Sequence, residues 1–301
     1  MIHEFKSHSD IVRCVAFSPI DAKTLATSSE YNTVCIWALS EDGKTATPRH
    51  RLTGHTHHVL SIAWSGDGLF LVSGSSDETI RMWSASTGEC RTEISTPDEV
   101  LTIALSPDSE RIVSGDDGCS IYIWETSTGV NFLGPLHGHT DSVWSVAYSP
   151  DGSQVLSGSA DGSVVVWNSS TGAKCFGPFI AYSDLIGSIS FHPSGEAFAT
   201  SSSDRTIVIW DAKTFKPIRN DLKTRDSATS VQYSVDGRFL LTAFDGGLSM
   251  WDTRRGRVVS ELTENGWSIW TAVFSPDGRW VASGRKGGTV IILEVGELGI
   301  P

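Results

Sequence analysis

Short stretches in which hydrophobic and polar residues alternate, or in which hydrophobic residues run together, follow one another along the whole chain. Alternation over about four to eight residues is typical of a strand with one buried face, and a short apolar run between turn residues is typical of a strand buried on both faces. Within residues 138–179 these criteria predict four strands, over Val143–Tyr148, Gln154–Gly158, Ser163–Trp167 and Lys174–Phe179. Four antiparallel strands in this span leave no room for a helix.

Tryptophan marks the end of the third strand at a nearly constant interval. The six residues are Trp37, Trp83, Trp124, Trp167, Trp210 and Trp251, with gaps of 46, 41, 43, 43 and 41 residues. A further step of 42 residues reaches Leu293, in the similar run Thr289–Leu293. A fixed period of about 40–45 residues with strand patterning indicates stacked or radial repeats. The sequence therefore predicts seven copies of one four-stranded unit.

The turns recur with the same period. Ser-Pro-Asp begins at residues 106, 149 and 275, and Ser-Thr-Gly begins at residues 86, 127 and 170. Together with the Gly-His pairs at residues 54–55 and 138–139 and the periodic Trp, this pattern resembles the WD-repeat family of β-propellers over essentially the whole chain. The resemblance implies an all-β fold, a seven-bladed β-propeller with four antiparallel strands per blade around a channel.

The two ends of the chain suggest how this ring closes. Residues 1–6 precede His8 as residues 51–54 precede His55, whereas residues 269–294 supply only three strands. We therefore expect the N-terminal strand to complete the last blade, which removes exposed sheet edges. On this interpretation residues 1–301 form a single WD-repeat propeller, with blades at about 7–52, 53–95, 96–136, 137–179, 180–222, 223–262 and 263–296 plus the closing strand 1–6.

In the WD-repeat family, a buried network links a His, a Ser or Thr, an Asp and the Trp of one repeat. Two repeats match all four positions with the same spacing: His55, Ser73, Asp77 and Trp83, and His139, Ser157, Asp161 and Trp167. Ser, His and Asp are also the residue types of a hydrolytic triad. Because the set occurs twice and includes an indole N–H that needs a partner when buried, we interpret it as structural. We predict no catalytic residue and no enzyme activity.

Charge and composition narrow the class of partner. The net charge is −12, of which −10 falls in residues 1–150 (9 Lys+Arg, 19 Asp+Glu) and −2 in residues 151–301 (14 against 16). An acidic chain is poorly suited to neutralise phosphates, so nucleic acid is not expected as the main partner. No run of about 20 apolar residues predicts a membrane span, and the first residues lack a basic-then-apolar leader. We expect a monomeric, cytoplasmic protein, with the nucleus as an alternative location.

Three local motifs suggest other chemistry, and each has a structural interpretation. His57 follows His55 at metal-ligand spacing, yet no Cys or carboxylate is adjacent and His55 belongs to the network. Gly284–Gly288 is glycine-rich but lacks the spacing of a phosphate-binding loop. The Arg-Arg-Gly-Arg run at 254–257 is interpreted as a solvated turn, with a basic patch as the alternative. We predict no metal and no cofactor, and the five cysteines are interpreted as reduced thiols.

The copies differ at positions that the resemblance places on one rim of the ring, here called the top rim. Family members make most partner contacts there. One position is aligned to Trp144, which lies five residues after His139, and is held by Arg13, Leu60, Leu101, Trp144, Gly187, Thr229 and Trp270. The other lies just before the turn Asp: Glu30, Ser76, Asp117, Ala160, Ser203, Phe244 and Lys286. The predicted partner-binding set is Arg13, Glu30, His58, Leu60, Glu99, Leu101, Asp117, Trp144, Thr229, Phe244, Trp270 and Lys286.

Large apolar side chains surrounded by charges on a rim are typical of a protein interface. Two interpretations stay open at this point: a binding surface, or side chains that fill the channel and help to pack the ring. We predict a non-catalytic scaffold that docks a peptide or protein partner on the top rim, within a multi-protein complex. The alternatives are a small-ligand or enzymatic propeller that uses the central channel, and a sensor domain like the WD-repeat arrays of signalling NTPases.

Overall fold

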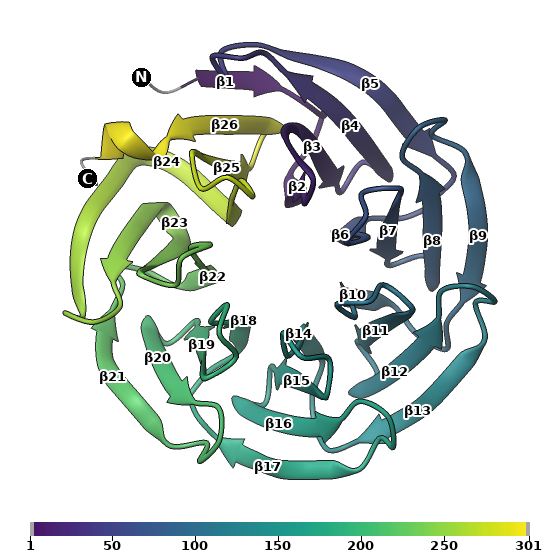
Figure 1. The fold of residues 1–301 in the computed structure, drawn as a ribbon, viewed down its shortest axis with the longest axis vertical. Helices are drawn as coiled ribbons and strands as arrows, with labels where there is room; N and C mark the ends of the chain where they lie inside the picture. Colours follow the sequence, from purple (N-terminus) through teal and green to yellow (C-terminus); the bar gives the residue numbers. More distant parts are fainter. Residues whose placement is uncertain (1–2, 299–301) are drawn as a thin grey trace.

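The computed structural model describes residues 3–298, and the side chains of all these except residue 221, residues 264–267 and residues 297–298. It confirms the predicted seven-bladed β-propeller (Figure 1). Besides strands, the described residues contain one short 3₁₀ helix, η1 (Val295–Leu298). Within the described part of the chain, no helix is long and apolar enough to cross a membrane.

Each of the first five blades is a sheet of four consecutive antiparallel strands, with the first strand nearest the channel and the fourth outermost (Figure 1). Blade 1 contains β2 (Val12–Ser18), β3 (Asp21–Ser29), β4 (Thr33–Leu39) and β5 (Ala46–Thr53). Blade 2 contains β6 (Val59–Trp64), β7 (Phe70–Ser75), β8 (Thr79–Ser84) and β9 (Cys90–Ser95). Blade 3 contains β10 (Val100–Leu105), β11 (Arg111–Asp116), β12 (Ser120–Glu125) and β13 (Asn131–His137).

The remaining blades follow the same order. Blade 4 contains β14 (Val143–Tyr148), β15 (Gln154–Ser159), β16 (Ser163–Asn168) and β17 (Lys174–Ile180). Blade 5 contains β18 (Ile186–Phe191), β19 (Ala197–Ser202), β20 (Thr206–Asp211) and β21 (Pro217–Lys223). The strands of blades 6 and 7 are, in chain order, β22 (Ala228–Tyr233), β23 (Phe239–Asp252), β24 (Arg257–Phe274), β25 (Trp280–Arg285) and β26 (Thr289–Glu294). The long β24 is the outer strand of blade 6 and then the inner strand of blade 7.

The ring closes through β1 (His3–Lys6), which pairs antiparallel with β26 from His3–Ile292 to Lys6–Thr289. This confirms the predicted closing strand for the described residues, and residues 1 and 2 of that prediction lie outside them. The ring of Phe5 packs 5.0 Å, centroid to centroid, from that of Trp37 in blade 1. The two ends of the chain therefore complete the last blade together and join it to the first.

The hydrophobic core is divided among the spaces between blades. The buried apolar residues form seven clusters, one between each pair of neighbouring blades. The third strand of a blade is buried on both faces, as in Ser163–Trp167, which explains why its sequence is almost wholly apolar. A blade cannot bury both faces alone, so each depends on its two neighbours.

The predicted hydrogen bonds are present in both complete repeats. Trp83 Nε1 donates to Ser73 Oγ (2.8 Å), which lies 2.7 Å from His55 Nε2, and His55 Nδ1 lies 2.9 Å from Asp77 Oδ2. Burial lowers the pKa of His55 despite the Asp77 charge, so the ring is neutral at pH 7. A neutral ring that accepts the Ser73 hydroxyl at Nε2 and donates from Nδ1 to the carboxylate satisfies all four side chains.

In blade 4, Trp167 Nε1 donates to Ser157 Oγ (2.9 Å), which lies 2.7 Å from His139 Nε2. The Nδ1 atom of His139 is 2.9 Å from Ser163 Oγ and 3.5 Å from Asp161 Oδ2. The carboxylate of Asp161 accepts the backbone N–H of Thr140 (2.8 Å). This blade therefore keeps the network, but His139 Nδ1 lies closer to the Ser163 hydroxyl than to the Asp161 carboxylate.

Incomplete repeats keep parts of this arrangement. In blade 5, Tyr182 replaces the histidine, and its hydroxyl lies 2.6 Å from Thr200 Oγ1. In blade 7, Leu293 stands in place of the Trp, and the buried hydroxyl of Ser283 has no hydrogen-bond partner among the described residues. Ser283 pairs with Ala272 as Ser73 pairs with Ile62, so the two serines occupy equivalent positions.

These two serines make a matched pair for a stability test. We predict that Ser73→Ala lowers the free energy of unfolding by about 2 kcal/mol, because it leaves the buried Trp83 N–H and His55 Nε2 without a partner. Ser283→Ala removes a buried hydroxyl that makes no hydrogen bond to the described residues, so it should change this free energy by less than about 0.5 kcal/mol or increase it. Urea unfolding followed by circular dichroism measures both, and equal losses would contradict the role assigned to the network.

Candidate partner-binding rim

Every inner strand carries a β-bulge at the position five residues after the histidine site. The pairing between the first and second strands of each blade skips one residue: Arg13, Leu60, Leu101, Trp144, Gly187, Thr229 and Trp270. A bulged residue is left unpaired, and the local kink re-aims its side chain. Seven bulges at equivalent positions in a closed ring therefore present seven residues at one end of the channel.

The structure brings these seven residues together around one cavity of about 450 Å³. Its apolar lining comes chiefly from Leu60, Leu101, Trp144 and Trp270, on blades 2, 3, 4 and 7. Three further lining residues, Leu185, Ser227 and Ser268, lie two residues before a bulge and were not predicted. Two predicted residues, His58 and Glu99, hold this same position in blades 2 and 3. The repeat spacing could therefore have identified the other three residues from these two.

The bulged residues of blades 5 and 6 are small, namely Gly187 and Thr229. At Gly187, an added Cβ would lie 2.9 Å from the carbonyl oxygen of Ala228, so the inner strands of blades 5 and 6 approach too closely for a side chain. Thr229 Oγ1 lies 3.0 Å from the carbonyl oxygen of Ile269 in blade 7. The bulge positions are therefore unequal: four blades contribute a large apolar side chain to the cavity, whereas blades 5 and 6 contribute Gly187 and Thr229.

Arg13 is fixed between a carboxylate and an aromatic ring. Its Nε donates to Glu30 Oε1 (2.7 Å), and its Cζ lies 4.1 Å from the centroid of the Trp270 ring. The Arg13 and Glu30 side chains are only 20% and 15% exposed. Trp270 Nε1 is buried and has no hydrogen-bond partner among the described residues. The charge of Arg13 is thus compensated within the protein, and the stacked pair forms a preformed edge of the cavity.

Acidic side chains lie along the rim of blades 3 and 4. Glu99, Asp117 and Asp141 are exposed, and Asp117 Oδ1 accepts a hydrogen bond from Ser142 Oγ (2.6 Å). Asp116 lies behind them and is only 4% exposed. Burial raises its pKa to about 6, helped by the charges of Asp98 and Asp117, although the Ser120 N–H donates to it (2.6 Å). Blades 1, 2, 4 and 5 have a serine at this place.

The structure corrects the prediction for Phe244. This residue is 1% exposed and pairs with Ala228, the place that Ser159 holds opposite Val143. Trp251 donates to Thr242, nine residues earlier, whereas the corresponding separation in other blades is ten residues. The hairpin of blade 6 is therefore one residue shorter, so Phe244 moves into the core. Asp245 takes the rim position instead, where it is exposed and lines the cavity.

The remaining predicted residues lie in the loops around the cavity and do not line it. Glu30 pairs with Arg13, and Lys286 is exposed. His58 is partly buried, and its ring packs 5.6 Å from that of His57. Backbone hydrogen bonds tie the loops to the bulges in the same way: Ser76 N–H to His58 O, Asp117 N–H to Glu99 O, and Lys286 N–H to Ser268 O, at 2.9, 3.1 and 2.9 Å. Each loop is thereby held at the channel mouth.

Comparison with known proteins identifies repeats along the whole chain. The WD domain, G-beta repeat family matches residues 1–38, 46–84, 88–125, 130–168, 173–211, 216–252 and 256–293. The chain is 39% identical over 85 residues to small ribosomal subunit protein RACK1 of Medicago sativa, covering 28% of this chain and 26% of the relative. For the RACK1 of Drosophila melanogaster the identity is 34% over 84 residues, covering 27% and 26%.

A protein of another name matches a segment of similar length. The WD repeat-containing protein 26 homolog of Arabidopsis thaliana is 38% identical over 85 residues, covering 28% of this chain and 14% of the relative. The chain thus matches only about a quarter, or less, of the length of these curated relatives.

Asp116 makes the free energy of unfolding of the protein depend on pH. Its pKa is about 6 in the folded protein against 3.8 for a free aspartate side chain, so the folded state holds the proton more tightly. The stability that this proton contributes is present below about pH 4 and is lost as the pH rises to about 6. We predict that Asp116→Asn raises the free energy of unfolding by about 3 kcal/mol at pH 8 and has little effect at pH 4.

Thermal and urea unfolding between pH 4 and pH 8 measure this difference. Glu99→Gln, which removes an exposed charge from the same blade, is the control and should change stability by less than about 0.5 kcal/mol at either pH. A gain for Asp116→Asn that is the same at both pH values would contradict the assignment of the raised pKa to this carboxyl.

Proposed function

The chain belongs to the WD-repeat family, and from this premise we propose that it is a non-catalytic scaffold that docks a peptide or protein partner on its top rim. One observation carries the proposal: a single cavity at the channel mouth is lined by a residue from every blade. A side chain of a partner that entered this cavity would lie among residues contributed by all seven repeats.

The chemistry of the rim suits a protein partner. Trp144 and Trp270 are only partly buried, and aromatic side chains of this kind dominate the energy of protein interfaces. Their backbone is fixed by the bulges, and Arg13 is already stacked and paired, so little conformational entropy remains to be lost on binding. The acidic residues of blades 3 and 4 would favour a partner with basic residues beside its inserted apolar side chain.

The residues of the buried His–Ser–Trp network do not support catalysis. The Ser73 and Ser157 side chains are 0% exposed and hydrogen-bond to an indole N–H, so neither hydroxyl can reach a substrate. The RACK1 relatives are named as small ribosomal subunit proteins, and their matched segment is about two repeats long. This likeness supports an interaction scaffold within a larger complex, and the partner that we propose for this chain is a protein.

A second candidate function rests on the volume of the cavity. About 450 Å³ lies within the range of about 300–1,000 Å³ that is typical of small-molecule sites. A metabolite that binds there would raise the melting temperature, because it binds only the folded state. We predict no such stabilisation in a thermal-shift screen of metabolites. An increase of several degrees by one compound, abolished by Trp144→Ala, would favour the small-ligand function.

The docking proposal predicts which variants lose the partner. In quantitative affinity capture from the native host, Trp144→Ala/Trp270→Ala should reduce recovery of the main partner at least tenfold, because truncating an aromatic hot spot costs about 2 kcal/mol or more. Val258→Ala, on an exposed outer strand, is the control and should recover the partner like the unmodified protein. Circular dichroism verifies that each variant is folded.

Equal recovery of every partner by the double variant and the control would contradict docking on the top rim. Leu60→Asp provides a second variant that leaves both tryptophans in place. It should also lose the partner, because it puts an unpaired charge into the apolar side of the cavity.

A further inference from the structure

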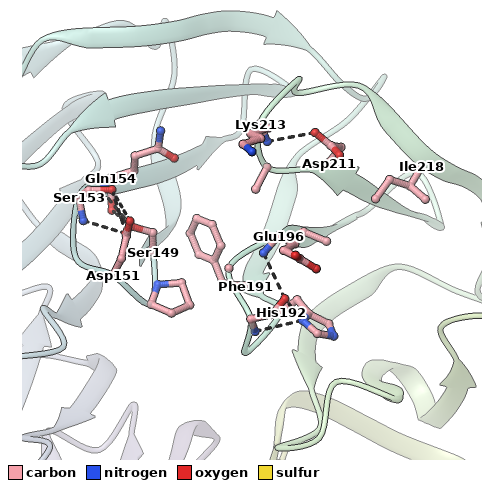
Figure 2. A pocket seen from close by; sticks show the side chains of 15 residues that line it. Ser149, Asp151, Ser153, Gln154, Phe191, His192, Glu196, Asp211, Lys213 and Ile218 are labelled. Carbon is pink, nitrogen blue, oxygen red and sulfur yellow. Dashed lines mark hydrogen bonds between the residues drawn. The ribbon is translucent and has the colours of Figure 1, made fainter.

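Figure 2 shows a second cavity, which lies between blades 4 and 5. It is at the opposite end of the strands from the top rim. Its volume is about 830 Å³, and its walls are the turn Ser149–Gln154 of blade 4 and the segments Phe191–Ala197 and Asp211–Lys213 of blade 5. The strand order places these turns at the end remote from the bulges, because each first strand runs from its bulge toward the turn that joins it to the second strand. The cavity is therefore separate from the site proposed above.

The neighbouring space, between blades 3 and 4, is filled by an arginine of the protein itself. Arg111 begins the second strand of blade 3, and its Nη1 donates to the carbonyl oxygen of Ser169 in blade 4 (3.3 Å). The guanidinium carbon lies 3.6 Å from the centroid of the Phe132 ring. An intramolecular arginine therefore crosses from one blade to the next, stacked on an aromatic ring.

The equivalent residues between blades 4 and 5 are smaller. Gln154 begins the second strand of blade 4, and its register with Asn168 matches that of Arg111 with Glu125. Ala212 stands two residues after Trp210, as Ser169 stands two residues after Trp167. Both Gln154 and Ala212 line the cavity, so the space that Arg111 occupies in one interface is empty in the next.

The cavity has the charge and the aromatic surface that a guanidinium requires. Asp151, Glu196 and Asp211 line it with one lysine, Lys213, which leaves an excess of two negative charges. The carboxylates of Asp151 and Asp211 accept hydrogen bonds from their own turns, which hold their pKa values low and keep both ionised. The Glu196 carboxylate makes no hydrogen bond within the described residues. In the view of Figure 2 the Phe191 ring lies between the turns of Asp151 and Glu196.

We propose that this cavity binds an arginine side chain from an extended segment of a partner protein. The guanidinium would stack on Phe191, which lies on the inner strand of blade 5, and donate to the Glu196 carboxylate. Gln154 would accept a further N–H at its amide oxygen, and the arginine methylenes would pack against Ala212 and the exposed Ile218.

The size of the cavity identifies the source of the arginine. A volume of about 830 Å³ is in the upper part of the range for drug-sized ligands, so it accommodates residues on both sides of the arginine as well. A free amino acid would leave most of this volume unfilled, because it lacks flanking residues. A peptide segment supplies those residues on both sides of its arginine.

Three capped probes and the full chain test this proposal by isothermal titration. We expect acetyl-Ala-Arg-Ala-amide to bind in the millimolar range, and the same peptide with neutral citrulline to bind at least tenfold more weakly. Free L-arginine should also bind more weakly than the arginine peptide. Citrulline binding that equals arginine binding, or tighter binding of free arginine, would overturn the proposal, as would no measurable binding of the arginine peptide.

Two variants place the binding in this cavity. Gln154→Arg should abolish binding of the arginine peptide, because the new guanidinium would occupy the place proposed for the arginine of the peptide. Glu196→Gln should weaken binding roughly fivefold and leave the melting temperature unchanged, because it removes one partly exposed charge. Glu110→Gln, at the equivalent turn of blade 3, is the control, and it should leave the affinity for the arginine peptide unchanged. Arginine-peptide binding that is unaffected by both Gln154→Arg and Glu196→Gln would refute the assignment.

Discussion

The pairing of β1 with β26 is the constraint on which the rest of the structure depends. A four-stranded blade has two apolar faces and cannot bury both, so each blade needs a neighbour on either side. Only a closed ring supplies a neighbour to both faces of every blade. Because β1 comes from the start of the chain and β26 from its end, closure also brings Arg13 of blade 1 onto Trp270 of blade 7. The ring thus orders the rim before any partner arrives.

The two cavities show how one repeated unit acquires specific surfaces. At the bulge, the strand pairing is the same in all blades, and the residue there decides what the blade contributes. Gly187 lets its inner strand approach the next one closely, whereas Trp144 adds an apolar side chain to the cavity. Between blades, the difference between Arg111 and Gln154 decides whether a space is filled. In both cases the common fold supplies the position, and one side chain determines whether a site exists there.

Much of this structure could be predicted from the chain, because its determinants are local or periodic. The Trp interval and the turn residues indicate seven blades, and aligning the repeats on the residue five after His139 finds all seven bulges. Phe244 was misplaced because Asp245 keeps the usual distance of six residues from Trp251, which hides a deletion that only strand pairing reveals. The cavity between blades 4 and 5 could not be predicted, because three segments of two blades form it. It also depends on Gln154 being shorter than Arg111, the residue at the same position of blade 3.

The central claim is that the rim built by the seven bulges is where a partner docks. Site-specific photo-crosslinking in the native host tests this most directly, with a benzophenone amino acid placed at Leu60 on the cavity wall or at Val258 on an outer strand of the ring. The account predicts a covalent adduct with one partner protein from position 60 and none from position 258. Adducts from position 258 with none from position 60 would contradict it.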